Sequence, residues 1–159
     1  MHVATAAGSA VRGVEYMRRS GDAWTRMQPE PFHGVGCGVG LGVAPDGSAH
    51  VAYMLGDVLR VMRYGPSGSA LSEPDRFDWI GSPYLSAAVD AQGRPHIAYA
   101  DPAGLVKHAV RIGDAWVTSP IAGGGDAPEV AMLPDGRAAI VHAVSGGVRG
   151  PISLEVGGD

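Results

Sequence analysis

The chain has 159 residues, of which 25 are glycine and 12 are proline, and this share of glycine is about twice the usual one. So much glycine and proline excludes long helices, while a hydrophobic fraction of 45% still permits a folded core. The net charge is −4 and the 12 basic residues are scattered rather than gathered in a stripe, which argues against a nucleic-acid-binding protein.

Cysteine content and hydropathy also argue against disulfide-bonded, cysteine-ligated metal and membrane-spanning proteins. Cys37 is the only cysteine, so an internal disulfide and cysteine-based zinc or iron sites are excluded. No apolar run approaches the roughly 18 residues of a membrane helix, and no secretory leader pattern follows Met1. We therefore expect a soluble chain without membrane insertion, cytoplasmic by default, with a secreted or surface location left open.

An internal repeat organises the chain. Three segments align without gaps, with spacings of 46 and 43 residues: G-S-A-H-V-A-Y (47–53), G-R-P-H-I-A-Y (93–99) and G-R-A-A-I-V-H (136–142). An incomplete copy, H-V-A, stands at 2–4. A second block, G-D-A-W, occurs at 21–24 and again 92 residues later, at twice the period of 46. A period of this size indicates a repeat architecture.

Within one repeat the apolar residues alternate, which predicts strands. Val39, Leu41 and Val43 alternate with glycines, and the next copy repeats the alternation at 84–89. One repeat then reads as four strands, at 83–89, 95–100, 105–111 and 116–121. Asp46-Gly47, the segment 90–93 and Asp135-Gly136 are predicted hairpin turns.

Four short strands in about 45 residues are typical of a β-propeller blade. We therefore predict an all-β fold with four-stranded antiparallel blades, about three and a half per chain, in a single half-propeller domain over residues 1–159. The predicted blades are 1–30 (partial), 37–80, 83–122 and 126–159 (partial).

A run of glycines between residues 34 and 42 belongs to the first strand of a blade. It matches neither G-x-G-x-x-G nor G-x-x-x-x-G-K, so a phosphate-binding loop is not indicated. We expect instead that these small residues let the innermost strands of neighbouring blades approach closely. Tyr84 and Glu129 interrupt the small residues at this position and are predicted to project into the crowded central region.

The pattern V-D-x-x-G-x-P-H-I-A-Y, a basic strand and then G-D-x-W, complete from Val89 to Trp116, resembles the bacterial β-propeller repeats of the BNR/Asp-box and sialidase-like superfamily. The resemblance covers essentially the whole chain and implies a ring of six to eight blades. It also implies one of three kinds of function: a glycan-binding lectin, a glycosidase or a scaffold. The Asp-box motif itself, S-x-D-x-G-x-x-W, has no match in the chain.

Three histidines, His2, His50 and His96, share one repeat position. Because each falls on a different blade, they cannot converge on one metal ion. We expect structural histidines, each bonded to a backbone group at the turn of its own blade, and no metal site or cofactor. His142 replaces the tyrosine of the other copies and is a candidate ligand contact.

The tyrosines and tryptophans that recur on the repeat are expected to pack between blades, and the alternative is that they stack on a sugar. Carboxylates just beyond the second strand, or near the axis, would complete such a sugar pocket. The candidate ligand-binding residues are Tyr53, Asp57, Tyr84, Tyr99, Asp101, Glu129 and His142.

Catalytic patterns are missing from the sequence. None of the five glutamates stands in a repeated or motif context, and no G-x-S-x-G segment is present. We therefore predict no catalytic residues and a non-catalytic binding or scaffold module for a glycan or protein. The alternative is a sialidase-like glycoside hydrolase or lyase whose site forms only in the assembled ring.

The predicted number of strands indicates that the chain needs a partner to close a ring. Fourteen strands are too few for a closed ring, and an open half would expose strand edges and an apolar face. Two copies would supply seven blades of four strands, or six blades with a redundant pair. We expect ring closure by self-association or with another propeller-containing chain; the competing account is a segment of a longer protein.

Overall fold

The computed structural model describes residues 1–7, 13–30, 35–77, 84–101, 103–122, 125–144 and 152–156. These residues form fourteen strands and no helix, as the glycine and proline content predicts. The predicted all-β fold class is confirmed. No helix of the described ranges is long and apolar enough to span a membrane.

The strands form four antiparallel sheets in chain order, and each strand pairs with its neighbour in sequence. Sheet 1 contains β1 (His2–Ala7), β2 (Gly13–Ser20) and β3 (Ala23–Glu30). Sheet 2 contains β4 (Val35–Val43), β5 (Ala49–Leu55), β6 (Val58–Gly65) and β7 (Gly68–Arg76). Sheet 3 contains β8 (Leu85–Val89), β9 (Pro95–Ala100), β10 (Val106–Ile112) and β11 (Ala115–Ala122). Sheet 4 contains β12 (Gly125–Met132), β13 (Ala138–Val144) and β14 (Ile152–Val156).

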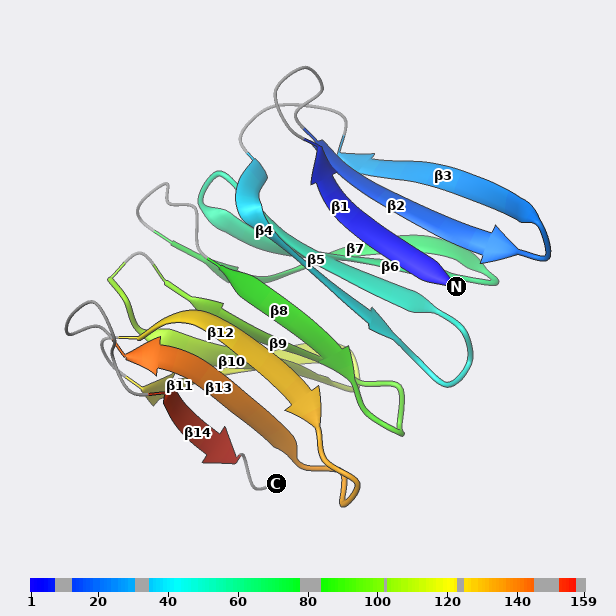
Figure 1. The fold of residues 1–159 in the computed structure, drawn as a ribbon. Helices are drawn as coiled ribbons and strands as arrows, with labels where there is room; N and C mark the ends of the chain where they lie inside the picture. The colour runs from blue at the N-terminus through cyan, green and yellow to red at the C-terminus, as the bar shows by residue number, and fades with distance from the viewer. Residues whose placement is uncertain are drawn as a thin grey trace.

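The sheets lie one after another (Figure 1), and their innermost strands are neighbours. Strand β4 contacts β8, β8 contacts β12, and β1 contacts β4. The repeat places β1 in register with β5, β9 and β13, the second strands of the later sheets. Sheet 1 therefore begins with its second strand, and β1 is an edge strand while β5, β9 and β13 are interior.

The hairpin turns predicted from the repeat are confirmed. The turn glycines Gly47, Gly93 and Gly136 have φ of 79°, 81° and 89°, a region that suits glycine. Each donates its N–H to the carbonyl three residues earlier, at 2.9 to 3.0 Å. An aspartate caps each turn: in the third sheet, Asp90 Oδ1 accepts the N–H of Arg94 at 2.7 Å.

The glycines of β4 let it touch the backbone of β8, which confirms the expected role of Gly40 and Gly42. A Cβ on Gly40 would lie 2.7 Å from the backbone nitrogen of Ala87, and one on Gly42 would lie 3.0 Å from the carbonyl carbon of Ala88. Real Cβ atoms essentially never approach another atom to 2.7 Å, and a distance of 3.0 Å is tighter than nine in ten real Cβ contacts. Gly34, at the start of the predicted run, lies outside the described residues.

Apolar side chains fill the space between consecutive sheets. Val14, Tyr16, Val51 and Tyr53 form a core between sheets 1 and 2. The core between sheets 2 and 3 contains Met54, Leu59, Phe77, Ile97 and Tyr99, and that between sheets 3 and 4 contains Ala98, Val106, Val130 and Ile140. Each interior sheet is therefore buried on both faces, which explains the unbroken burial of β9.

Sheets 3 and 4 are also tied by hydrogen bonds. Val130 on β12 donates its N–H to Oγ of Ser86 on β8 at 2.7 Å. Gly125 donates its N–H to the carbonyl of Gly104 at 2.9 Å. These bonds fix the position of β12 against the preceding sheet.

The close approach of β4 and β8 predicts the effect of one methyl group. Gly40→Ala should lower the free energy of unfolding by about 1–3 kcal/mol, because β4 must move away from β8. Urea unfolding followed by circular dichroism measures this. The matched control is Gly65→Ala, where the new methyl would meet only the guanidinium of Arg63, which can move aside. Equal effects of the two substitutions would contradict the packing account.

Candidate functional site

Of the seven candidate residues, the structure brings Tyr99 and Asp101 into one cluster. The Tyr99 hydroxyl donates to Oδ2 of Asp75 at 2.7 Å. The Lys107 ammonium lies 3.3 Å from the same Asp75 oxygen and 3.4 Å from Oδ2 of Asp101. It also lies 5.2 Å from the centre of the Phe77 ring. The cluster links β7 of sheet 2 to β9 and β10 of sheet 3.

The contacts of this cluster join sheets 2 and 3. The Tyr99 side chain is fully buried, and burial together with its hydrogen bond to Asp75 raises the pKa of its hydroxyl. The hydroxyl therefore stays protonated and donates to the carboxylate. The Lys107 ammonium lies within ion-pair distance of both carboxylates, so the arrangement joins the two sheets through one shared cation.

The other candidates lie apart from one another. Tyr53 is buried in the core between sheets 1 and 2. Asp57 follows β5 and pairs with Arg76 at 2.8 Å, on the surface. Tyr84 is 53% exposed and Glu129 is also exposed in this chain, and their place near the crowded axis of a closed ring remains a prediction. In this structure the inner strands of sheets 3 and 4 leave both side chains facing solvent.

His142 on β13 is buried, and its Nδ1 lies 3.3 Å from the carbonyl oxygen of Ala143. Its Nε2 has no hydrogen-bond partner among the described residues. A Cβ on Gly125 would lie 2.6 Å from its Nδ1, so the glycine makes room for the ring. The buried imidazole therefore lies against Gly125 of β12, and the same glycine faces Val106 of sheet 3.

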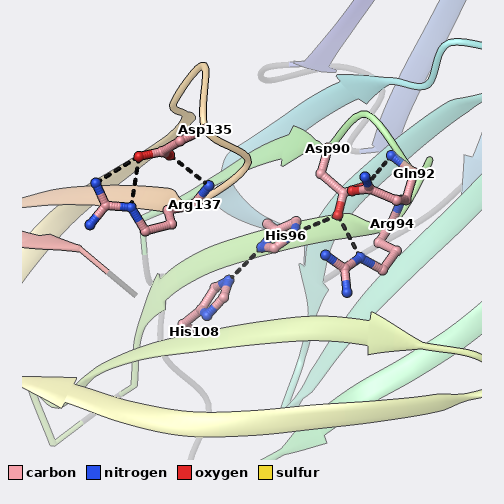
Figure 2. Close-up of polar contacts among 7 residues, drawn as sticks. All are labelled: Asp90, Gln92, Arg94, His96, His108, Asp135 and Arg137. Carbon is pink, nitrogen blue, oxygen red and sulfur yellow. Dashed lines mark hydrogen bonds and ion pairs between the residues drawn. The ribbon is translucent and has the colours of Figure 1, made fainter. Parts of the chain in front are cut away.

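A second polar group lies between sheets 3 and 4, around two histidines (Figure 2). Nδ1 of His96 is 3.0 Å from Nε2 of His108, and the two rings stack with centroids 5.1 Å apart. Nε2 of His96 is 3.3 Å from Oδ2 of Asp90. The same oxygen accepts a hydrogen bond from Nε of Arg94 at 2.5 Å. Hydrogen bonds from Arg94 and His96 lower the pKa of Asp90 in spite of its burial.

Two of the repeated histidines contact side chains of their own sheets, and the predicted bonds of all three to backbone groups remain a prediction. Nε2 of His96 lies 3.3 Å from Oδ2 of Asp90 in its own turn. Nδ1 of His2 is bonded to the Tyr16 hydroxyl at 2.7 Å on the neighbouring strand. The alignment shows which residues recur, but the partner of each imidazole depends on the side chains of adjacent strands.

These histidines surround a pocket of about 250 Å³ that sheets 3 and 4 line together. Its polar lining comes from Arg94, His96, His108, Ser119 and Arg137. Its apolar wall consists of Val110, Ile112 and Val117. No group of three or more metal-ligating side chains is found among the described residues.

This pocket was not among the predicted sites, although the aligned repeats contain a signal for it. The turn glycine is followed by arginine in the third and fourth copies, Arg94 and Arg137, and by Ser48 in the second. Two consecutive blades with this arginine place two guanidinium groups beside one pocket. His108, on the third strand, has no repeated counterpart that would have drawn attention to it.

No protein-family model matches the chain, and no curated protein matches it in sequence. Its fold is similar to that of a leech intramolecular trans-sialidase, with a TM-score of 0.53 and 15% sequence identity. The match covers 93% of this chain and 27% of the leech protein, so the chain spans about a quarter of its length. The described residues therefore have the fold of part of a sialidase-like β-propeller.

The cluster around Asp75 predicts a difference between two candidate residues. Tyr99→Phe should lower the free energy of unfolding by about 1–2 kcal/mol, because it removes a buried hydrogen bond to a charged group. Asp57→Asn removes only an exposed ion pair and should cost less than about 0.5 kcal/mol. Thermal and urea unfolding of both variants measures this. If Tyr99→Phe leaves the free energy of unfolding unchanged, the hydroxyl does not hold the sheets together.

Proposed function

We propose that this chain is a non-catalytic binding or scaffold segment of a propeller, whose ring is completed by a second copy packed against sheet 1. The observation that carries the proposal is the contrast between Trp24 and Trp116, which share one repeat position. Trp116 packs on the core between sheets 2 and 3. Trp24 is 46% exposed on the outermost sheet.

The register explains this contrast. Trp24 is paired with Arg19 and Trp116 with Arg111, so the two indoles occupy the same place in their sheets. Strand β7 of sheet 2 lies against β11 of sheet 3. The corresponding face of sheet 1 has no sheet of the described residues on it. A further blade packed there would bury Trp24 as sheet 2 buries Trp116.

The carboxylates support a non-catalytic role. Two of the described glutamates are held in ion pairs between neighbouring strands, Glu15 with Arg26 and Glu73 with Arg60. The pKa values of Asp46, Asp90 and Asp135 are lowered, mainly by hydrogen bonds within their turns. A general acid for glycoside cleavage needs the opposite, a raised pKa.

The proposal predicts the mass of the protein in solution. Light scattering should give about twice the chain mass of 16.3 kDa. Trp24→Lys should shift the protein to the monomer, because a charge cannot be buried without a partner. Leu71→Lys, at an apolar side chain that is 45% exposed on β7, should leave the mass unchanged. A wild-type monomer at all concentrations would contradict completion by a second copy.

The same assembled protein distinguishes binding from catalysis. It should bind ligands on a glycan array without releasing fluorophore from a panel of fluorogenic glycosides. Turnover that is lost in Glu129→Gln would contradict the non-catalytic proposal and favour a hydrolase or lyase formed in the ring.

A further inference from the structure

We infer that the pocket between sheets 3 and 4 is a binding site for a compact hydroxy-carboxylate with an apolar face. The pocket is formed by one chain, so the inference does not depend on how the ring is completed. Three features of the pocket carry it: two oriented guanidinium groups, a free imidazole acceptor and an aliphatic wall.

The guanidinium groups come from two equivalent turns. Arg94 is held by Asp90 through its Nε alone. Arg137 is held through Nε and Nη2, at 2.9 and 2.7 Å from Oδ2 of Asp135. Both Nη atoms of Arg94 and Nη1 of Arg137 have no partner among the described residues. Figure 2 shows the two side chains on either side of the histidine pair.

The carboxylates orient these arginines without blocking them. Both arginines line the pocket, whereas Asp90 and Asp135 do not. The remaining N–H groups are therefore donors held in place before a ligand arrives, which reduces the entropy lost on binding. Planar guanidinium groups with free N–H pairs match the two oxygens of a carboxylate.

The histidine pair supplies an acceptor. Because the Asp90 carboxylate can only accept, Nε2 of His96 carries hydrogen, and in the neutral form of His96 its Nδ1 accepts the hydrogen bond from Nε2 of His108. Nδ1 of His108 is then left with a lone pair. Burial and the neighbouring His96 lower the pKa of His108 to about 4, so its imidazole is neutral at neutral pH and keeps one acceptor nitrogen. A hydroxyl group of a ligand can donate to it.

The remaining wall is aliphatic and only partly covered by protein. Ile112 and Val117 are 51% and 43% exposed, and Val110 also lines the pocket. A ligand with one apolar face would cover these side chains and gain hydrophobic free energy. A pocket of about 250 Å³ suits a small molecule rather than a chain segment.

Isothermal titration with mandelate tests the site, because mandelate combines a carboxylate, a hydroxyl and an apolar ring. We expect saturable binding of one mandelate per chain. Phenylacetate, which lacks the hydroxyl, should bind at least threefold more weakly. 1-Phenyl-1,2-ethanediol, which lacks the carboxylate, should bind at least tenfold more weakly. No saturable binding of mandelate, or equal binding of the diol, would overturn the inference.

Two matched variants locate the site. Arg137→Gln should weaken mandelate binding at least tenfold, while Arg63→Gln should change it less than twofold. Arg63 is also paired with a turn aspartate, Asp46, but lies outside the pocket. Circular dichroism confirms that both variants are folded, and amide shifts at Ser119 and Gly136 should follow the titration in the wild type. Equal loss in the two variants, or shifts elsewhere only, would also overturn the inference.

Discussion

The contact between the backbones of neighbouring inner strands determines how the rest of this structure is arranged. At Gly40 and Gly42 the β4 strand lies so close to β8 that no side chain fits between them. This distance sets the separation of sheets 2 and 3, and therefore the width available to the core residues Met54, Phe77 and Tyr99. Packed protein interiors contain few voids. The two sheets can therefore pack tightly against these side chains only if the residues of the inner strands are small.

The interfaces between sheets share this backbone arrangement but differ in their polar side chains. Between sheets 2 and 3 the polar positions are filled by Asp75, Tyr99 and Lys107, which satisfy one another. Between sheets 3 and 4 the buried His142 takes the repeat position of Tyr99. The pocket lined by Arg94, Arg137 and the histidine pair lies at other positions of the same interface. Repeats with the same backbone structure can therefore form an ion-paired cluster at one interface and a pocket at the next. A few differences in side chains between the repeats decide which of the two forms. The fold is similar to that of a trans-sialidase, but a shared fold does not define a function, which depends on the side chains at the site.

Much of the fold could be predicted from the sequence, because the repeat places turn glycines, alternating strands and small inner residues at fixed intervals. The hairpins at Gly47, Gly93 and Gly136 follow directly from it. The site could not be predicted in the same way. Asp75 and Tyr99 are 24 residues apart and meet only because sheets 2 and 3 pack together. Likewise, the partner of His96 is set by its neighbours on β10 and in the turn, which a single strand pattern does not contain. The division of the chain into half of a ring remains a prediction.

The central claim is that β4 and β8 are in backbone contact. It is tested most directly by nuclear Overhauser effects in the isotope-labelled protein. The hydrogen of Gly40 that stands where a Cβ would be should give a strong cross-peak to the amide hydrogen of Ala87, since that Cβ position is 2.7 Å from the Ala87 nitrogen. Assigned resonances for both residues without such a cross-peak would contradict the account, because sheets 2 and 3 would then be farther apart than the structure requires.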